Sequence, residues 1–341
     1  MKPFPALANA RQEILDIPNA LRQTLTKGRP GYEALIRRMR WGEGPVYMVG
    51  SGVSAILGLA GAYAFESHLG RPVIARPAVD FRAYSLAIVQ PRSVVVAISC
   101  SGEPDETLEA ARAAQQRGAA VFALTANPES ELAKTADGVF LVRSGEEPSS
   151  GIKAAVCQAA VLSYLSLLSA RLLKRPDAQL GSILAEFEKL PEYAEWVLTQ
   201  IPDAIRSFAS ELRSAKALCV AGAGFYHTAV LQWARLWREL AGIPVAVPEP
   251  MDFRDAFWLG MNRGATAVLL SGSRCRLKKE IHELVRLRRE DGSSILSITD
   301  PNDRELVSSS QLAILLPVLS EMTGSIVALI ALGYAAYEAS R

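Results

Sequence analysis

The sequence predicts an α/β fold: two tandem doubly wound parallel sheets of flavodoxin-like type, preceded by a helical N-terminal arm. Three observations carry this prediction. Short apolar runs alternate with helical segments, the second half of the chain repeats the first, and a glycine turn follows the first apolar run of each half. Strands separated by helices indicate a parallel sheet that helices cover on both faces. The chain has 341 residues, enough for two such domains.

The repeat shows as a nearly constant offset between matching residues. An offset of 172 relates the glycine turns, an Asp-Phe-Arg segment and a pair of serines: Gly50 and Gly52 match Gly222 and Gly224, Asp80-Phe81-Arg82 matches Asp252-Phe253-Arg254, and Ser99 and Ser101 match Ser271 and Ser273. Further along, the offset becomes 174, which takes Thr125 to Thr299 and Glu147 to Glu321. The period is far too long for a solenoid, so each copy is expected to be a domain.

Each half has the same expected order of elements. In the first half we expect strands at 46–49, 72–75, 93–98, 120–124 and 138–142, and helices at 53–68 and 104–117. In the second half we expect strands at 218–221, 245–247, 266–270, 294–298 and 312–316, a helix ending near 241 and another at 276–290. The expected divisions are an arm at 1–40, a first domain at 41–175, a helical connector at 176–215 and a second domain at 216–341.

The composition argues against several classes of partner. A net charge of +2, without a long run of Lys or Arg, gives no indication of nucleic-acid or membrane binding. The N-terminus has no apolar secretory signal, and the four cysteines are far apart, which fits reduced thiols in the cytoplasm. Two apolar stretches, 154–173 and 326–337, are expected to be buried helices rather than membrane spans, the second being too short.

The first candidate site is the turn at Gly50–Ser54. In a doubly wound sheet, ligands bind beyond the carboxyl ends of the strands where the strand order reverses. Glycines let backbone N–H groups approach an anion, and the following helix presents its positive end. A nicotinamide cofactor is disfavoured because Ala55 replaces the third glycine of that fingerprint and no acid ends the next strand. A purely structural tight turn is the other reading.

The second candidate site is the loop from Ser99 to Thr107. Two serine hydroxyls and several N–H groups precede the expected helix at 104–117, an arrangement that suits a phosphate monoester. The alternative is plain helix capping by Ser101, with Glu103 in the first turn. Two such loops on one sheet favour a ligand.

On these residues the chain resembles the sugar isomerase (SIS) family, and within it the tandem isomerase half of glucosamine-6-phosphate synthase and relatives that act on amino-sugar phosphates or sugar–amine conjugates. The matching pieces cover nearly the whole chain: Glu13-Ile14 with Pro18, Gly50-x-Gly52-x-Ser54, Phe65-Glu66-Ser67 before Gly70-x-Pro72, Asp80-Phe81-Arg82, and Ser99-x-Ser101-Gly102-Glu103. The resemblance implies tandem SIS-type domains, no cofactor, no metal and a homodimer.

The resemblance also implies a phosphate site in the first domain. Its residues would be Gly52, Ser54, Ser99, Cys100, Ser101 and Thr107, with Ser150 and Lys153 lining the substrate. Two positions depart from the family: Pro104 replaces a further hydroxyl, and Cys100 replaces the usual Gln or Arg between the serines. In the second copy, Arg274 and Cys275 replace the Gly-Glu of the loop. We therefore expect a degenerate loop there, although Arg274 could still bridge an anion.

For catalysis, the position that matches the family's base is Glu239, which could move a proton between C1 and C2 of a sugar. The alternative is a solvated helix glutamate paired with Arg235 at i−4. The family's Lys-His-Gly-Pro histidine is missing at Arg254–Phe257, so His227 is the histidine to test as a substitute acid, although a packing or surface role is the more ordinary reading.

The expected function is isomerisation, deamination or deglycation of a phosphorylated amino sugar or sugar–amine conjugate, in the cytoplasm and without an amidotransferase domain. A sugar-phosphate-binding protein without turnover is the alternative, which the missing histidine and Pro104 favour. A nucleotide-dependent oxidoreductase is a third reading. A homodimer is expected also because the two apolar helices would be poor surface helices on a monomer.

Overall fold

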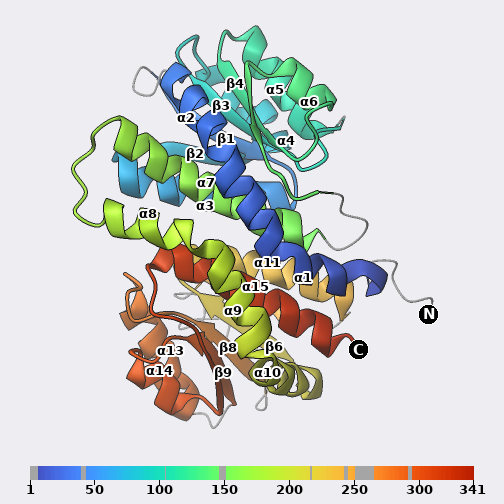
Figure 1. The fold of residues 1–341 in the computed structure, drawn as a ribbon, viewed down its shortest axis with the longest axis vertical. Helices are drawn as coiled ribbons and strands as arrows, with labels where there is room; N and C mark the ends of the chain where they lie inside the picture. Colours follow the sequence, from blue (N-terminus) through green and yellow to red (C-terminus); the bar gives the residue numbers. More distant parts are fainter. Residues whose placement is uncertain are drawn as a thin grey trace. The chain divides into compact units, whose positions relative to one another are not determined.

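The computed structural model describes residues 7–39, 44–103, 105–145, 151–215, 217–241, 245–249, 265–290 and 294–341. The chain divides into two compact units (Figure 1). The first domain comprises the described residues within Asn19–Glu147 and Lys153–Glu188. The second domain comprises the described residues within Met1–Pro18, Pro148–Ile152 and Lys189–Arg341. The boundaries between these two units differ from the boundaries expected from the sequence.

The first domain is built on a five-stranded parallel sheet, as predicted. Its strands are β1 (Val46–Gly50), β2 (Val73–Pro77), β3 (Val94–Ile98), β4 (Ala120–Thr125) and β5 (Gly138–Leu141). They run in the order β2-β1-β3-β4-β5, with every pair parallel. All residues of β1 and β3 are buried, because helices cover both faces of the sheet. The strand order reverses between β1 and β3, so this is where a ligand is expected.

The helices of the first domain are α2 (Gly28–Arg38), α3 (Val53–Leu69), α4 (Ala78–Asp80), α5 (Glu106–Gln116), α6 (Glu131–Thr135), α7 (Ile152–Leu172) and α8 (Leu180–Glu188), with a π-helical turn at Gln23–Lys27 and further turns at Phe81–Ser85 and Leu86–Ile88. One predicted boundary was wrong. Helix α5 begins at Glu106 rather than at 104, and its cap is Asp105, not Ser101. The Asp105 carboxylate accepts hydrogen bonds from the N–H groups of Thr107 and Leu108, at 2.7 and 3.2 Å.

The second domain has the same sheet. Its strands are β6 (Leu218–Gly222), β7 (Val245–Ala246), β8 (Thr266–Leu270), β9 (Ile295–Thr299) and β10 (Leu312–Leu315), in the order β10-β9-β8-β6-β7. Its helices are α9 (Leu190–Gln200), α10 (Pro202–Ser214), α11 (Phe225–Leu240), α13 (Lys278–Glu290), α14 (Arg304–Ser309) and α15 (Glu321–Ala339). Helix α1 (Leu7–Arg22) crosses the division between the two units. The strand order again reverses between the first and third strands, here β6 and β8.

Helices α7 and α15 are long and apolar enough to cross a membrane by length and composition, at 21 and 19 residues. Both are core helices of the folded chain, because 94% and 89% of their most apolar windows are buried. The expected burial is therefore confirmed, but the prediction that the second stretch is too short was wrong, since α15 extends well beyond 326–337. Burial within one chain also removes the argument for a dimer that rested on these two helices.

Candidate functional site

The candidate site lies at the carboxyl edge of the first sheet, where its strand order reverses. Two loops meet there, one after β1 and one after β3, and we name them together the first cradle: residues 51–54 and 99–103. Gly52 has φ 57° and ψ −120°, so its backbone lies in a region that glycine adopts with little strain. This turn starts α3 at Val53 with no side-chain cap, so the first N–H groups of the helix are not used by a capping side chain.

The loop after β3 is held in shape by its own hydroxyls and by the sheet. Ser99 is 5% exposed, and its Oγ accepts a hydrogen bond from the Gly102 N–H at 3.2 Å. Ser101 Oγ accepts one from the Glu103 N–H at 3.4 Å, and the Thr125 hydroxyl donates to the Cys100 carbonyl at 3.0 Å. The loop is therefore a built feature, in which Ser99 is already engaged and Ser101 faces solvent.

The two loops are joined through a residue that the sequence did not single out. Ser51 Oγ lies 3.3 Å from Thr107 Oγ1, so a hydroxyl pair links the glycine turn to the first turn of α5. Thr107 is fully buried, which places its hydroxyl against Ser51. Comparison of the two copies could have drawn attention to Ser51, because Ala223 takes its position in the second copy and a hydroxyl is present only in the first.

Two backbone donors of the first cradle have no partner among the residues that the structure describes: the N–H groups of Val53 and Ser101. The hydroxyl of Ser54 likewise has no hydrogen bond to another described residue. Ser54 and Cys100 are half-buried and Ser101 is exposed, so a ligand could reach all three. An N–H group at the start of α3 and another in the loop after β3, both without a partner among the described residues, favour an anion.

The predicted substrate-lining residues are only partly described. Lys153 lies in the first turn of α7 and is 5% exposed, with its Nζ 3.8 Å from the position a Cβ would take on Gly145. Its ammonium group therefore lies beside the segment that follows β5. Ser150 and Pro104 lie outside the described residues.

The two predicted catalytic residues are not brought together. Both lie on α11, twelve positions apart, which corresponds to roughly 18 Å along the helix axis. Glu239 has a side chain 44% exposed and forms an ion pair with Arg235 at 3.0 Å, the arrangement that the solvated-helix alternative predicts. Burial lowers the pKa of His227, against the opposing effects of Glu249 and the Gly222 backbone, so the neutral form of His227 is favoured. A neutral imidazole is a poor acid, which counts against the role of substitute acid.

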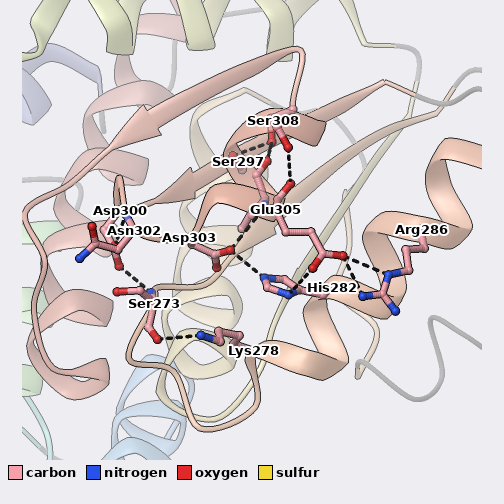
Figure 2. A network of polar contacts seen from close by, with 12 residues as sticks. Ser273, Lys278, His282, Arg286, Ser297, Asp300, Asn302, Asp303, Glu305 and Ser308 are labelled. Carbon is pink, nitrogen blue, oxygen red and sulfur yellow. Dashed lines mark hydrogen bonds and ion pairs between the residues drawn. The ribbon is translucent and has the colours of Figure 1, made fainter.

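The corresponding loops of the second domain, the second cradle, comprise residues 223–226 and 271–276. Here carboxylates take the backbone donors. Glu321 accepts hydrogen bonds from the N–H groups of Phe225 and Arg276, at 3.3 and 3.1 Å. Asp300 accepts one from the Ser273 N–H at 2.6 Å, and Figure 2 shows the two residues facing each other. The second cradle is therefore satisfied by residues of its own domain.

His282, farther along α13, belongs to a structural network (Figure 2). Its Nε2 lies 2.7 Å from Asp303 and its Nδ1 lies 3.0 Å from Glu305. Asp303 also caps α14, because its carboxylate accepts a hydrogen bond from the Leu306 N–H at 3.3 Å. With both ring nitrogens facing carboxylates, His282 links α13 to α14 and has no ring nitrogen left for a substrate.

The fold and the first cradle define a class: a doubly wound α/β protein with a candidate ligand site at the reversal of its strand order. Residues 41–172 match a family model described as SIS domain. Over 339 residues the chain is 26% identical to "Glutamine--fructose-6-phosphate aminotransferase [isomerizing]" of Symbiobacterium thermophilum. That match covers 96% of this chain and 55% of the relative, so the chain spans about half the length of that protein.

Solved structures show the same fold over nearly the whole chain. The C-terminal domain of glucosamine-fructose-6-phosphate aminotransferase from Francisella tularensis matches with a TM-score of 0.85 and 19% identity, covering 97% of this chain and 95% of that one. Tagatose-6-phosphate ketose/aldose isomerase from Escherichia coli matches at 0.76 and 18%, covering 97% and 92%. Glucosamine-6-phosphate deaminase from Thermotoga maritima matches at 0.72 and 17%, covering 97% and 94%. At these identities the likeness concerns the fold.

Proposed function

We propose that the first cradle binds the phosphate of a phosphorylated sugar. The observation that carries this proposal is a pair of N–H groups, those of Val53 and Ser101, which have no partner within the described part of the chain and lie at the strand-order reversal of a sheet. Exposed or half-buried hydroxyls at Ser54 and Ser101 surround these donors and can complete the site. Hydrogen bonds to a charged group contribute about 1.5–3 kcal/mol each, so loss of one such donor is expected to weaken phosphate binding by about tenfold or more.

We further propose that the chain acts on an amino-sugar phosphate or a sugar–amine conjugate at C1–C2, as an isomerase, deaminase or deglycase. The printed names of its relatives and structural neighbours support this: they include an aminotransferase that isomerises, a ketose/aldose isomerase and a deaminase. Glu239 is the proposed base, supported by a half-exposed carboxylate that can accept a proton. The relatives' own activities extend to this chain only as this proposal.

The experiment follows proton exchange at C2. The protein is incubated in deuterated buffer with fructose-6-phosphate, glucosamine-6-phosphate or an Amadori-type sugar phosphate, and C2 exchange is measured by NMR. Exchange that is abolished in Glu239→Gln and retained in Glu192→Gln, an acidic control on α9, supports the enzyme. Binding of a sugar phosphate without exchange of any substrate overturns the catalytic proposal and leaves the binding proposal intact.

The alternative of binding without turnover is favoured by one specific observation. His227 and Glu239 are separated along α11 by roughly 18 Å, and the neutral form of His227 is favoured. A base and an acid that both act on C1–C2 must lie within hydrogen-bond reach of the same few atoms. The chain therefore has to find its second proton-transfer group elsewhere, or it has none.

We retain a cytoplasmic homodimer as a separate proposal, now on another surface. Large hydrophobic side chains are exposed at three places within residues 79–88: Val79, Tyr84 and Ile88, with Tyr84 80% exposed. Exposed apolar groups gathered in one segment are typical of an interface. The cytoplasm is proposed because none of the four cysteines forms a disulfide bond, which is typical of a reducing compartment. A chain that elutes as a monomer at micromolar concentration, with or without Tyr84→Ser, contradicts the dimer.

A further inference from the structure

The glycine turns of the two cradles have the same backbone. Gly52 has φ 57° and ψ −120°, and its counterpart Gly224 has φ 56° and ψ −125°. The same turn hydrogen bonds follow in each copy: Ser54 N–H donates to the Ser51 carbonyl at 3.0 Å, and Tyr226 N–H donates to the Ala223 carbonyl at 3.1 Å. At the glycine turns, a difference in ligand binding between the copies must therefore come from side chains. The loops after β3 and β8 differ in backbone as well, because Gly102 has φ 65° and its counterpart Arg274 does not have a positive φ.

The donors of the second cradle are already held by two buried carboxylates. Glu321, 9% exposed, bridges the glycine turn and the start of the loop toward α13 through the N–H groups of Phe225 and Arg276. It lies so close to Gly224 that a Cβ there would collide with it. Asp300, 3% exposed, holds the Ser273 N–H. The carboxylates thus occupy the place where an incoming anion would accept these hydrogen bonds.

The first cradle has no counterpart of one of these two acceptors, Asp300. Val53 and Ser101 correspond to Phe225 and Ser273 and are unpartnered among the described residues. Ala126 stands at the place of Asp300. At the repeat offset of 174, the counterpart of Glu321 is Glu147, which lies outside the described residues.

The copies also differ in the space inside the loops. Tyr226 takes the position of Ser54, and burial holds the pKa of its phenol well above the usual value. Its hydroxyl lies 2.8 Å from where a Cβ on Gly272 would be and 2.6 Å from one on Gly324. A ring and a hydroxyl therefore fill the volume that a small serine leaves open in the first domain.

We propose that the second cradle is a closed copy of the anion site, in which Glu321 and Asp300 stand in for the ligand's negative charge and Tyr226 fills its space. An incoming phosphate would have to displace a buried, hydrogen-bonded carboxylate or lie beside it. Side by side, the negative charges of the phosphate and the carboxylate would repel each other. Arg274, which the sequence suggested as an anion bridge, is exposed in this loop. The chain then takes one phosphorylated ligand, in the first domain.

The test reopens the second cradle with the first one disabled. In a Ser54→Ala/Ser101→Ala background, the residues of the first copy are placed in the second as Tyr226→Ser and Asp300→Ala, together with Glu321→Ala. Glu283→Ala, which removes an exposed carboxylate from α13, is the matched control. Inorganic phosphate is titrated by calorimetry, circular dichroism confirms the fold, and each variant is compared with the wild-type chain.

We expect the disabled background to bind phosphate at least about tenfold more weakly than wild type, the reopened variant to regain one phosphate per chain, and Glu283→Ala to regain none. Should the reopened variant not fold, Asp300→Ala alone and the wild-type stoichiometry decide the question. A wild-type chain that binds two phosphates overturns the closure, as does a folded reopened variant without any gain. A wild-type chain that binds no phosphate contradicts the proposed function instead. In that case, a gain of phosphate binding in the reopened variant still tests the closure of the second cradle.

Discussion

Replacing Gly102 tests whether the shape of the first cradle matters for binding. Gly102 has φ 65°, a conformation that costs an L-residue about 1–2 kcal/mol. A Cβ there would also collide with Ser130 Oγ and lie 2.9 Å from Thr125 Oγ1. Overpacking adds about 1–3 kcal/mol, so Gly102→Ala is expected to lower the free energy of unfolding by about 2–5 kcal/mol.

The chain supplies a matched control. Gly70 ends α3 with φ 63°, and a Cβ on it meets nothing within 4 Å. Gly70→Ala should therefore show the backbone cost alone, about 1–2 kcal/mol. Urea titration compares the two variants, and a thermal scan should show a Tm difference of about 2–4 °C per kcal/mol for a domain of this size.

Ligand binding separates a strained loop from a binding loop. Gly102→Ala moves the Ser101 N–H, so we expect its affinity for fructose-6-phosphate to fall about tenfold or more, whereas Gly70→Ala keeps wild-type affinity. Calorimetry under conditions where both variants are folded measures this. Equal stabilities and equal affinities for the two variants would refute the assignment of this loop as a built phosphate site.

Three further outcomes are expected. Ser51→Ala removes the hydroxyl link to Thr107, so phosphate affinity should fall several-fold while the free energy of unfolding changes by about 1 kcal/mol or less. An unchanged affinity would show that this link plays no part in phosphate binding. Burial, and next the nearby Glu321, raise the pKa of the Cys275 thiol to about 12. At pH 8, iodoacetamide should therefore modify the half-buried Cys100 before Cys275, and bound phosphate should slow the reaction of Cys100. Faster alkylation of Cys275 than of Cys100 contradicts this. Burial lowers the pKa of His227, so its NMR titration midpoint in the folded protein should lie below 6.5. The folded state should then lose stability as the pH falls below the pKa that His227 has in the unfolded chain, and His227→Gln should not show this loss. A titration midpoint above 6.5 is the opposing result.

Much of the fold was predictable because buried parallel strands have a strong local signature. The run Ser93–Ile98 predicted β3 within one residue, and the repeat predicted that the second sheet would follow the same order. The start of α5 was less predictable, since both Ser101 and Asp105 can cap a helix and only the fold decides between them. Capping residues compete locally, whereas strand runs are supported by a whole sheet.

The candidate site was predictable in its residue types but not in its partners. Ser54, Ser99 and Ser101 follow from loop position, yet only the structure shows that Ser99 is used to hold Gly102. The role of Glu321 depends on two loops about 50 and 100 residues away in sequence, a relation that no local pattern contains. Glu239 matches by position alone, and its ion pair with Arg235 is a property of the helix surface.

The most direct test of the central claim is a crystal structure with bound fructose-6-phosphate. The phosphate is expected at the first cradle, accepting hydrogen bonds from the N–H groups of Val53 and Ser101 and from the hydroxyls of Ser54 and Ser101. The second cradle is expected to keep Glu321 in place. A phosphate bound in the second cradle, or one bound elsewhere while the Val53 and Ser101 donors remain unused, would contradict the account.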